Sequence, residues 1–580
     1  MQNIVHLSRH GPSNTVIARY EYAPLVTEII RTIPGREFKP AYKIWIFPGT
    51  PENVMLLKTR LAGIGWQLSI EPDLRASLNE QYRKVAQAAA VRTAGDAEVD
   101  FEFLTEPYAH QRAGLAFLAH LGSGALFWEM GLGKTKTAID YAEWLAPHGD
   151  HPRDGYVGRY DGCPGCTFKA LVICPNTVKR NWGDEIRKHA GHEDFIIPTG
   201  TIAKRITQLG LARYTIINVE AMSVASMARA VIEHPWDLVV ADESTRFKTP
   251  GAKRTKAFHK LGKVTPRRVI LTGTPITGAP QDAWSQLEFV QPGIFGSSFW
   301  AFTDRYLRKD FFGNVVGLKP ENADELKARI DSRGYRILKD QVLDLPPKVY
   351  VDRRVEMVGE QRRAYNQMRD ELRIEIEGME EVRAANILTV LLRLTQVTAG
   401  LIGQGTEYRF IEDGAKVTEL DALLNDELRD QQVVIFGLYQ RELEALARRY
   451  DDGSYGIGPY ALPIIYGPTP EKVRHELVAQ FQAGNRRLLF VQSRTGGLGI
   501  NLTKAQNAIY ATRGWSLEEY LQSQDRLHRI GQTGTVNIIH LLAEDSIDND
   551  IAKALADKQT LSDHLTGDTA RKLALSILSK

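Results

Sequence analysis

Short runs of apolar residues recur along the middle of the chain, and each is followed by a glycine-rich, polar or acidic turn. The run Ala125–Trp128 precedes a glycine loop and a stretch with helical spacing, Lys136–Leu145. Two further runs, Ala170–Cys174 and the β-branched segment Asp237–Glu243, have the length and composition of strands. Continuous apolar runs of this length are typical of strands covered on both faces. The pattern predicts strands that alternate with helices, as in an α/β protein.

The N-terminal part of the chain has a different pattern. Thr15–Tyr20 and Tyr42–Phe47 alternate or are rich in β-branched residues, which predicts strands. Leu25–Ile33 and Val54–Leu61 carry apolar residues at helical spacing, and Pro-Gly pairs separate the elements as turns. The order of strands and helices predicts a small α+β domain.

A glycine-rich segment, WEMGLGKT at Trp128–Thr135, lies between the first predicted strand and helix. Strand, glycine loop and helix is the arrangement that phosphate-binding loops require. Gly131 and Gly133 would let backbone N–H groups turn towards phosphate oxygens, helped by the dipole of the following helix. Lys134 would reach the β- and γ-phosphates, and the Thr135 hydroxyl would bind magnesium.

Adjacent carboxylates end the strand Asp237–Glu243, which assigns Asp242 to magnesium and Glu243 to general-base activation of the attacking water. Much later, QSQDRLHRIGQ contains Arg526 and Arg529, which are three residues apart and share one face if the segment is a helix. Two guanidinium groups suit the charge that develops on a γ-phosphate. The three patterns together predict ATP hydrolysis with arginines supplied by a second domain.

Composition narrows the class of protein. The chain has 580 residues, enough for three or four domains, with 43% hydrophobic and 25% charged residues. Only three cysteines are present, which excludes a disulfide scaffold and fits a reducing compartment. No apolar run is long enough to span a bilayer, so no membrane association is expected. The net charge of +3 is small, but residues 1–95 hold twelve Lys/Arg against seven Asp/Glu, a balance of +5 that could bind phosphates or be scattered surface charge.

A polar, glycine-rich segment precedes the strand Ala170–Cys174 and contains four side chains of the types that bind metal ions. His148 and His151 form one pair, and Cys163 and Cys166 form a second. The spacing suits one tetrahedral zinc ion, which would fold a segment that lacks its own core. A loop with two reduced thiols explains the same residues, and both interpretations stay open.

The motifs occur in the order found in Swi/Snf-type superfamily 2 helicase-like ATPases, which the chain resembles from about residue 100 to 555. Further matching segments are His110–Leu118, Cys174–Trp182, Ile217–Met222, Leu271–Gly278, Arg336–Lys348, Val433–Gln440 and Ser493–Ala505. The resemblance implies two RecA-like parallel-sheet lobes with helical insertions, ATP and Mg²⁺ as cofactors, and double-stranded DNA as partner. Two departures are Trp128, where the phosphate loop usually begins with glycine, and Thr245, where the family commonly has His or Gln. The second weakens expectations about how hydrolysis is coupled to DNA.

Carried over residue by residue, the resemblance implies two sets of contacts. The nucleotide-binding residues would be Gln111, Met130, Gly131, Leu132, Gly133, Lys134, Thr135 and Gly499. The DNA-contacting residues in the lobes would be Lys179, Asn181, Trp182, Thr274, Thr495 and Asn501.

The N-terminal module is similar to the HARP domain of annealing helicases. The similarity rests on Tyr22, Ile29, Ile30, Pro34, Arg36, Phe38 and the strand Lys43–Phe47. Arg36 and Lys39, near a predicted turn, are therefore candidate DNA contacts, whereas Trp45 and Phe47 are expected to face a small core.

The predicted organisation has five parts. They are a HARP-like domain and linker at 1–95, a first RecA-like lobe at 96–300, an inter-lobe helical region at 301–414, a second lobe at 415–545 and a C-terminal helical brace at 546–580.

These expectations converge on an ATP-dependent translocase on double-stranded DNA that acts on branched DNA by strand annealing, branch migration or fork regression. Two alternatives stay open: a motor that displaces proteins such as RNA polymerase from DNA, and a DNA-binding ATPase switch without processive movement. The chain is expected to act as a monomer. Its compactness, without nuclease or methylase motifs, is typical of a bacterial or phage protein in the cytoplasm of a bacterium or infected host.

Overall fold

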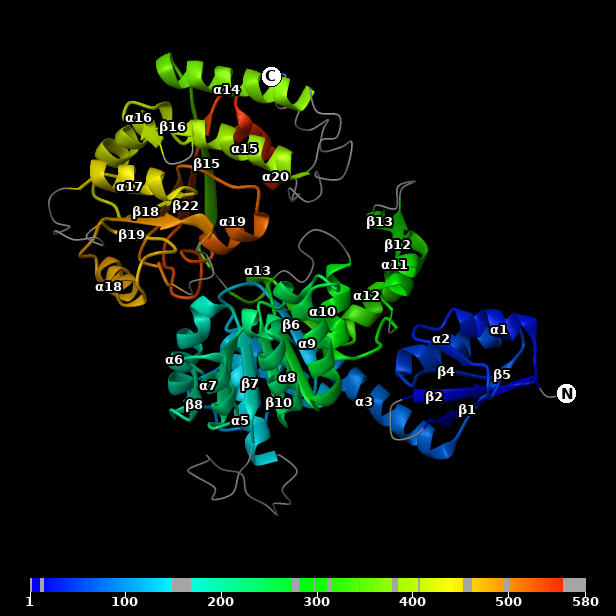
Figure 1. Cartoon of the computed structure of the whole chain (residues 1–580). Coiled ribbons are helices and arrows are strands. Elements are labelled where there is room, and N and C mark those ends of the chain that lie inside the picture. Colours follow the sequence, from blue (N-terminus) through cyan, green and yellow to red (C-terminus); the bar gives the residue numbers. More distant parts are fainter. Residues whose placement is uncertain are drawn as a thin grey trace. The chain divides into compact units, whose positions relative to one another are not determined.

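A computed structural model of the chain divides it into two units (Figure 1). The first unit comprises Met1–Glu129 and Gly133–Val342, and the second comprises Met130–Leu132 and Leu343–Lys580. The structure describes residues 3–10, 15–148, 168–273, 281–296, 298–309, 315–343, 345–377, 384–404, 407–451, 462–494 and 500–556. Each unit is described below by itself.

The first unit contains a seven-stranded sheet, the core of the first lobe, in the order β14-β6-β11-β10-β7-β9-β8. Its strands are β6 (Gly124–Trp128), β7 (Ala170–Cys174), β8 (Phe195–Ile196), β9 (Tyr214–Asn218), β10 (Leu238–Asp242), β11 (Arg267–Leu271) and β14 (Gly334–Ile337). The helices around them are α4 (Ala109–Leu121), α5 (Lys134–His148), α6 (Lys179–Ala190), α7 (Ile202–Thr207), α8 (Ala225–Glu233), α9 (Lys253–Val264) and α10 (Asp282–Val290). All recorded pairings within this sheet are parallel. Every residue of β6 and β7 is buried, as expected for strands covered on both faces, and the predicted α/β lobe is confirmed.

The second unit contains a six-stranded parallel sheet in the order β15-β22-β21-β18-β20-β19. Its strands are β15 (Lys348–Val355), β18 (Val433–Gly437), β19 (Ile464–Ile465), β20 (Leu488–Gln492), β21 (Asn507–Tyr510) and β22 (Val536–Ala543). Its helices are α14 (Gly359–Glu377), α15 (Ala384–Thr398), α16 (Ala415–Ala422), α17 (Gln440–Arg449), α18 (Glu471–Gln482), α19 (Leu517–Gln524) and α20 (Ile547–Ala556), and β16 (Leu401–Gln404) pairs with β17 (Glu407–Phe410) as a hairpin. This second sheet confirms the expectation of two RecA-like lobes.

A buried carboxylate fastens α20 to the second lobe. Asp548, 4% exposed, pairs with Lys416 of α16 at 2.6 Å and accepts a hydrogen bond from the Thr398 hydroxyl at 3.0 Å. The backbone N–H of Ile547 donates to the Tyr365 hydroxyl of α14 at 2.9 Å. The start of α20 therefore contacts three helices of the second lobe. The residues after Ala556 lie outside the described part of the chain, so the C-terminal brace stays a prediction.

The N-terminal domain is a five-stranded mixed sheet in the order β3-β4-β2-β1-β5. Its elements are β1 (Ile4–Arg9), β2 (Thr15–Arg19), α1 (Pro24–Arg31), β3 (Glu37–Lys39), β4 (Ile44–Pro48), α2 (Pro51–Ala62), β5 (Gln67–Ile70) and α3 (Pro72–Ala94). The predicted α+β domain is confirmed, and the predicted helical linker is α3, which packs on α4. The strand β1, which lies between β2 and β5, was not expected from the sequence. Phe47 is fully buried and Trp45 packs at the edge of the same core, as predicted.

Arginines from the first lobe hold the N-terminal domain in place. Arg329, 2% exposed, donates hydrogen bonds to Asn53 Oδ1 at 3.1 Å and to the Ile294 carbonyl at 2.7 Å. Arg305 donates to the Thr32 carbonyl at 2.9 Å. Arg329 lies in α12 (Ala323–Asp331) and Arg305 in α11 (Phe299–Tyr306), which are joined through the hairpin β12 (Leu307–Lys309) and β13 (Val315–Leu318). A buried guanidinium is stable only where its N–H groups are satisfied, so these bonds define the seating of the domain on the lobe.

Both sheets extend into the region that the sequence analysis assigned to inter-lobe helices. Gly334 of β14 pairs with Ala125 of β6 in the first sheet, beyond the lobe end predicted at residue 300. Lys348 of β15 pairs with Val536 of β22 in the second sheet. A four-residue strand such as β14 is too short to show a period, which explains why the sequence pattern did not reveal it. Among the described residues, no helix is long and apolar enough to cross a membrane.

Glu288 of α10 gives the first unit a pH dependence that can be measured. Its side chain accepts a hydrogen bond from the Gly293 N–H at 2.8 Å, and burial raises its pKa to about 7. Because the folded state holds this proton more tightly than the unfolded chain, the stabilisation is present below about pH 4.5 and is lost as pH rises through 7. Glu288→Gln keeps the acceptor without the charge. We expect it to raise the free energy of unfolding by about 1–3 kcal/mol near pH 8, and by much less near pH 5. Urea unfolding of both proteins at the two pH values tests this, and an equal gain at both would contradict it.

Candidate active site

The phosphate loop between β6 and α5 has a backbone that requires glycine at two positions. Gly131 and Gly133 have φ values of 85° and 79°, in the left-handed region that other residues avoid. A Cβ atom at position 133 would lie 2.1 Å from Nε2 of Gln111, so that amide lies directly against the loop. Gln111 is itself fixed in the capping box of α4, where its Oε1 accepts from the Tyr108 N–H at 3.1 Å. The structure thus brings the predicted base-recognition residue next to the predicted phosphate loop.

Lys134 and Trp128 complete the loop. The Lys134 ammonium donates to the carbonyls of Trp128 at 2.7 Å and Glu129 at 3.2 Å, which holds the side chain along its own loop. Trp128, which replaces the usual first glycine, is fully buried, and its ring lies 5.3 Å from His110 and 5.7 Å from Tyr335. Trp128 therefore packs beneath α4. The glycines that bend the loop, Gly131 and Gly133, are both present.

The acidic pair lies at the carboxyl end of β10. Asp242 Oδ2 accepts from the Trp182 indole N–H at 2.9 Å, and Oδ1 accepts from the Glu243 N–H at 3.0 Å. Burial raises the pKa of Asp242, while the Trp182 hydrogen bond and the charge of Lys134 lower it. Glu243 has a φ of 49°, an uncommon conformation for a residue with a side chain and one that concentrates at functional sites. Lys134 is therefore electrostatically close to Asp242, as a shared site for nucleotide and metal requires.

The predicted metal ligands fit Mg²⁺ by their chemistry. Thr135 lies in the first turn of α5 and offers a hydroxyl, and Asp242 offers a carboxylate on the same sheet edge. Oxygen donors of this kind suit Mg²⁺, which when bound would neutralise charge on the β- and γ-phosphates. Among the described residues, no group of three or more His, Cys, Asp or Glu side chains is arranged to hold a metal ion by itself.

Trp182 differs from its predicted role. It was expected to contact DNA, but it is 1% exposed and its indole N–H is directed to Asp242. A side chain this buried offers DNA no surface, so the structure assigns Trp182 to positioning the acidic pair. Gln286 of α10, which the sequence did not single out, plays a related part: it accepts from the Ser244 hydroxyl at 2.7 Å and fixes the turn that contains Thr245. Neither contact has a sequence signature, because both depend on the packing of distant helices.

The two arginines do not lie on a helix. α19 ends at Gln524, and residues 525–531 form a series of turns, so the predicted helical face of Arg526 and Arg529 is wrong. Gln532 fixes the turns by donating to the carbonyls of Leu527 at 3.1 Å and Ala505 at 3.0 Å. The Arg526 carbonyl accepts from the Leu502 N–H at 2.9 Å. The arginines are held by tertiary hydrogen bonds rather than by helical spacing.

The other predicted DNA contacts are partly placed. Lys179 and Asn181 lie half-buried on the first turns of α6, and Asn501 is exposed after β20. Arg36 is exposed before β3, and Lys39 is ion-paired with Glu37. Predicted residues that lie outside the described part of the chain are Thr274, Thr495, Gly499, His151, Cys163 and Cys166. His148 ends α5, and its side chain is also outside, so the zinc hypothesis stays a prediction.

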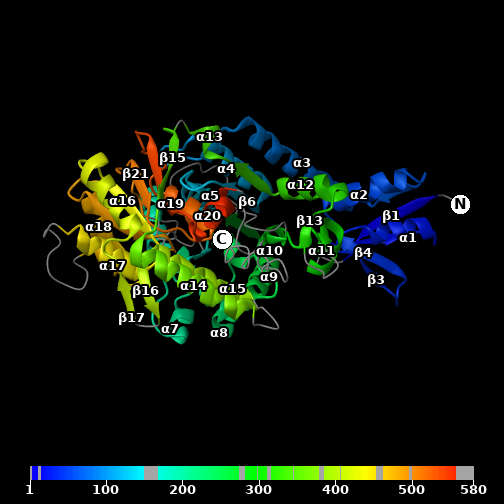
Figure 2. The ribbon, with the colours of Figure 1, turned by 90° about the horizontal axis from the view of Figure 1, so that it is seen from above.

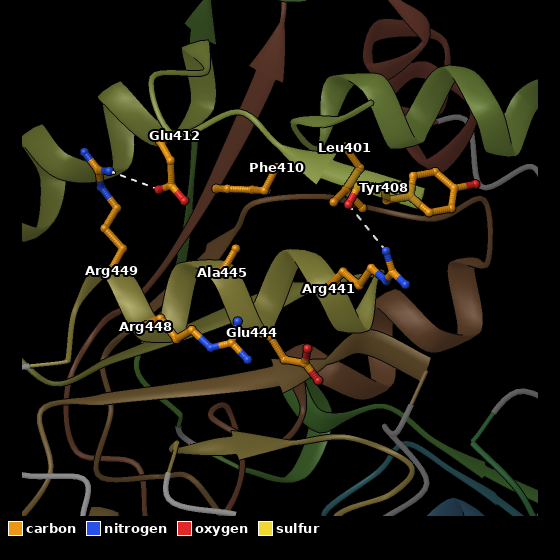
Figure 3. Close-up of a pocket in the computed structure, with 9 residues that line it drawn as sticks. All are labelled: Leu401, Tyr408, Phe410, Glu412, Arg441, Glu444, Ala445, Arg448 and Arg449. Carbon is orange, nitrogen blue, oxygen red and sulfur yellow. Dashed lines mark hydrogen bonds and ion pairs between the residues drawn. The ribbon is translucent and has the colours of Figure 1, made fainter. Parts of the chain in front are cut away.

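A pocket of about 630 Å³ opens in the second lobe between the β16–β17 hairpin and α17 (Figure 3). Its lining residues are Leu401, Tyr408, Phe410, Glu412, Arg441, Glu444, Ala445, Arg448 and Arg449. Arg449 is fixed by Asp421 at 2.6 Å, and the Arg441 guanidinium lies 5.6 Å from the Tyr408 ring centroid. The pocket contains none of the residues predicted to bind nucleotide or DNA.

Comparison with known proteins agrees with this geometry. A family model described as the SNF2-related domain matches residues 110–400, and one described as the helicase conserved C-terminal domain matches residues 415–531. An uncharacterized ATP-dependent helicase of Mycoplasma pneumoniae is 26% identical over 474 residues, which are 80% of this chain and 43% of that relative. The Zorya protein ZorD of Escherichia coli is 26% identical over 490 residues, 75% of this chain and 42% of that protein. The chain spans less than half the length of these relatives. The solved SWI2/SNF2 ATPase core of Sulfolobus solfataricus in complex with dsDNA aligns with a TM-score of 0.39 at 23% identity, covering 82% of this chain and 96% of that one.

The position of Trp182 leads to a test that separates its two roles. Trp182→Phe removes the hydrogen bond to Asp242 and keeps most of the buried volume. We expect the rate of ATP hydrolysis to fall about ten-fold to a hundred-fold, because hydrogen bonds to charged groups contribute about 1.5–3 kcal/mol. The acid limb of the pH–rate profile should move to higher pH, since that hydrogen bond lowers the pKa of Asp242. Steady-state assays across pH measure both effects. A loss of DNA affinity with unchanged hydrolysis would instead restore Trp182 as a DNA contact.

Proposed function

Because this chain belongs to the SNF2-related family of helicase-like ATPases, we propose that it uses ATP hydrolysis to move along double-stranded DNA and that its substrates are branched. Its action on them would be strand annealing, branch migration or fork regression. The observation that carries the proposal is the joint between the motor and the N-terminal domain. That domain is seated on the first lobe by the buried Arg329 and by Arg305. A DNA-binding domain held in this way would move together with the lobe, unlike a domain attached by a flexible linker.

The chemical step follows from the residues around the phosphate loop. Lys134 and the loop amides would bind the phosphates, Asp242 and Thr135 would hold a magnesium ion that neutralises phosphate charge, and Glu243 would orient and deprotonate the attacking water. Arg526 and Arg529 would supply the positive charge that stabilises the developing charge on the γ-phosphate. Cycles of nucleotide binding and hydrolysis would then change the domain arrangement and move the protein along the duplex.

Lys134→Ala is expected to abolish ATP hydrolysis while the chain still folds, because the ammonium donates to carbonyls of its own glycine loop and does not pack in a hydrophobic core. The measurement is phosphate release with saturating duplex DNA, beside circular dichroism of the variant. Wild-type turnover in a folded variant would refute the motor itself. Lys256→Ala, on α9, is the matched control for the loss of one lysine.

Arg526→Ala and Arg529→Ala are each expected to reduce turnover by roughly a thousandfold or more, the loss that follows removal of an arginine finger. Nucleotide affinity should fall far less, because the phosphate loop is untouched. Arg526 is 6% exposed, so its variant also needs an unfolding measurement. Normal hydrolysis in both variants would leave the arginines a structural role in the turn.

Fork regression separates the proposal from its alternatives. The wild-type chain should convert a model replication fork to the regressed four-strand product in an ATP-dependent reaction, with ATPase stimulated strongly by duplex DNA. A motor that clears proteins would be stimulated by duplex but fail on the fork and release a bound RNA polymerase. A switch would show little stimulation by any DNA.

A further inference from the structure

The N-terminal domain carries the two most exposed large hydrophobic side chains in the described part of the chain. Tyr22 is 83% exposed and Tyr42 is 77% exposed, and Phe38 is 42% exposed. Scattered apolar residues are ordinary on protein surfaces, but aromatic rings gathered at one place indicate a binding surface. Phe38 lies in β3, Tyr42 lies in the turn between β3 and β4, and Tyr22 lies between β2 and α1.

Strand register brings the rings together. Ala18 of β2 pairs with Trp45 of β4, so the chain after β2, with Tyr22, and the chain before β4, with Tyr42, leave the sheet at the same end. Phe38 of the edge strand β3 also pairs with Trp45, and their ring centroids are 5.0 Å apart. In Figure 2 the strand β3 projects from the rest of the domain. The β3–β4 hairpin therefore presents Phe38 and Tyr42 along an open edge.

Positive charge alternates with these rings. From Arg36 to Lys43 the hairpin has the cations Arg36, Lys39 and Lys43 and the single carboxylate Glu37. Lys39 is paired with Glu37, whereas Arg36 and Lys43 have no side-chain hydrogen bond or ion pair among the described residues. The two uncommitted cations thus flank Phe38 and Tyr42.

The lobe adds to this charge at the Arg36 end of the hairpin. The pKa of Arg36 is lowered by partial burial and by repulsion from Arg305 and Arg31. Burial and repulsion from Arg305 likewise lower the pKa of Arg60 in α2. Arg305 and Arg31 have carboxylate partners in Glu325 and Glu28, and Asp304 offsets part of the repulsion. An added anion at this end would relieve repulsion that the protein itself leaves in place.

We propose that the β3–β4 hairpin, with Tyr22 beside it, binds single-stranded DNA: bases stack on Phe38, Tyr42 and Tyr22, and backbone phosphates pair with Arg36 and Lys43. Alternating aromatic and basic side chains form the surfaces that bind single strands, because every base has a face that stacks. In a duplex the bases are stacked on one another, so they have no free faces on which these rings could stack. β3 itself spans about 10 Å, the length of about three stacked nucleotides.

This inference rests on the proposed function, because a branch point is where single-stranded DNA lies next to the duplex on which the motor moves. The motor would hold the duplex and the hairpin would hold the displaced strand. A protein partner that uses exposed aromatics is the competing occupant, and the experiment distinguishes it.

The test uses the full chain and a fluorescein-labelled oligothymidine, followed by anisotropy without nucleotide. Tyr22→Leu, Phe38→Leu and Tyr42→Leu keep an apolar side chain and remove the stacking ring, and each should weaken binding about five-fold to a hundred-fold. Tyr22→Phe and Tyr42→Phe keep the ring and should bind as the wild type does. Met55→Ala, a 48% exposed apolar residue of α2 in the same domain, is the control for loss of surface area. Arg36→Gln and Lys43→Gln should weaken binding and reduce its salt dependence.

Two further readouts keep the outcomes distinct. Ultraviolet crosslinking of a bromodeoxyuridine-containing strand, mapped by mass spectrometry, should label the hairpin or Tyr22. Duplex-stimulated ATPase should be unchanged in the three aromatic-to-leucine variants, in Lys43→Gln and in the control variants. A variant that combines Tyr22→Leu, Phe38→Leu and Tyr42→Leu gives the decisive measurement. If its affinity for oligothymidine is unchanged, the inference is wrong and the surface binds a protein partner, while the proposed motor function is unaffected. Absence of DNA-stimulated ATPase in the wild type would overturn the proposed function, whatever the hairpin binds.

Discussion

Parallel strand pairing is the constraint from which the chemistry of the first lobe follows. β6, β11 and β10 are neighbours and run in one direction, so the residues after each strand leave the sheet at one edge. The glycine loop follows β6 and the acidic pair ends β10, which brings a positive loop and a negative turn together although more than a hundred residues separate them. Because the loop and the turn are close to each other, the positive charge of Lys134 lowers the pKa of Asp242. If β6 and β10 ran in opposite directions, the two loops would lie at opposite edges of the sheet.

Sequence patterns were sufficient where a single physical demand controls a segment. The strands β6 and β7 were predicted to within one residue because both faces of each are covered, which demands a continuous apolar run. The glycines of the phosphate loop were identified because only glycine adopts the required backbone conformation. Both cases depend on local chemistry, which a sequence displays directly.

Prediction failed where tertiary contacts decide. The three-residue spacing of Arg526 and Arg529 fits a helix, yet Gln532 donates hydrogen bonds to the nearby Leu527 carbonyl and to the remote Ala505 carbonyl, which stabilise turns in its place. Trp182 occupies a segment that resembles a DNA-contacting motif, but the side chain turns inwards to Asp242. β14 is a short strand whose partner lies some two hundred residues earlier in the chain. In each case the controlling partner is remote in sequence, so no local pattern records it.

The contact between Gly133 and Gln111 links two parts of the site that usually are considered separately. The Gln111 amide occupies the volume where a side chain at position 133 would be, so the loop and helix α4 fit together as a steric interlock. A base that hydrogen-bonds the amide and draws it away would leave the loop backbone with more room at the moment the phosphates arrive. Binding of the base at Gln111 would then change the space available to the phosphate loop. The two positions should also be unable to change independently during evolution, because any larger residue at one demands a smaller or displaced side chain at the other.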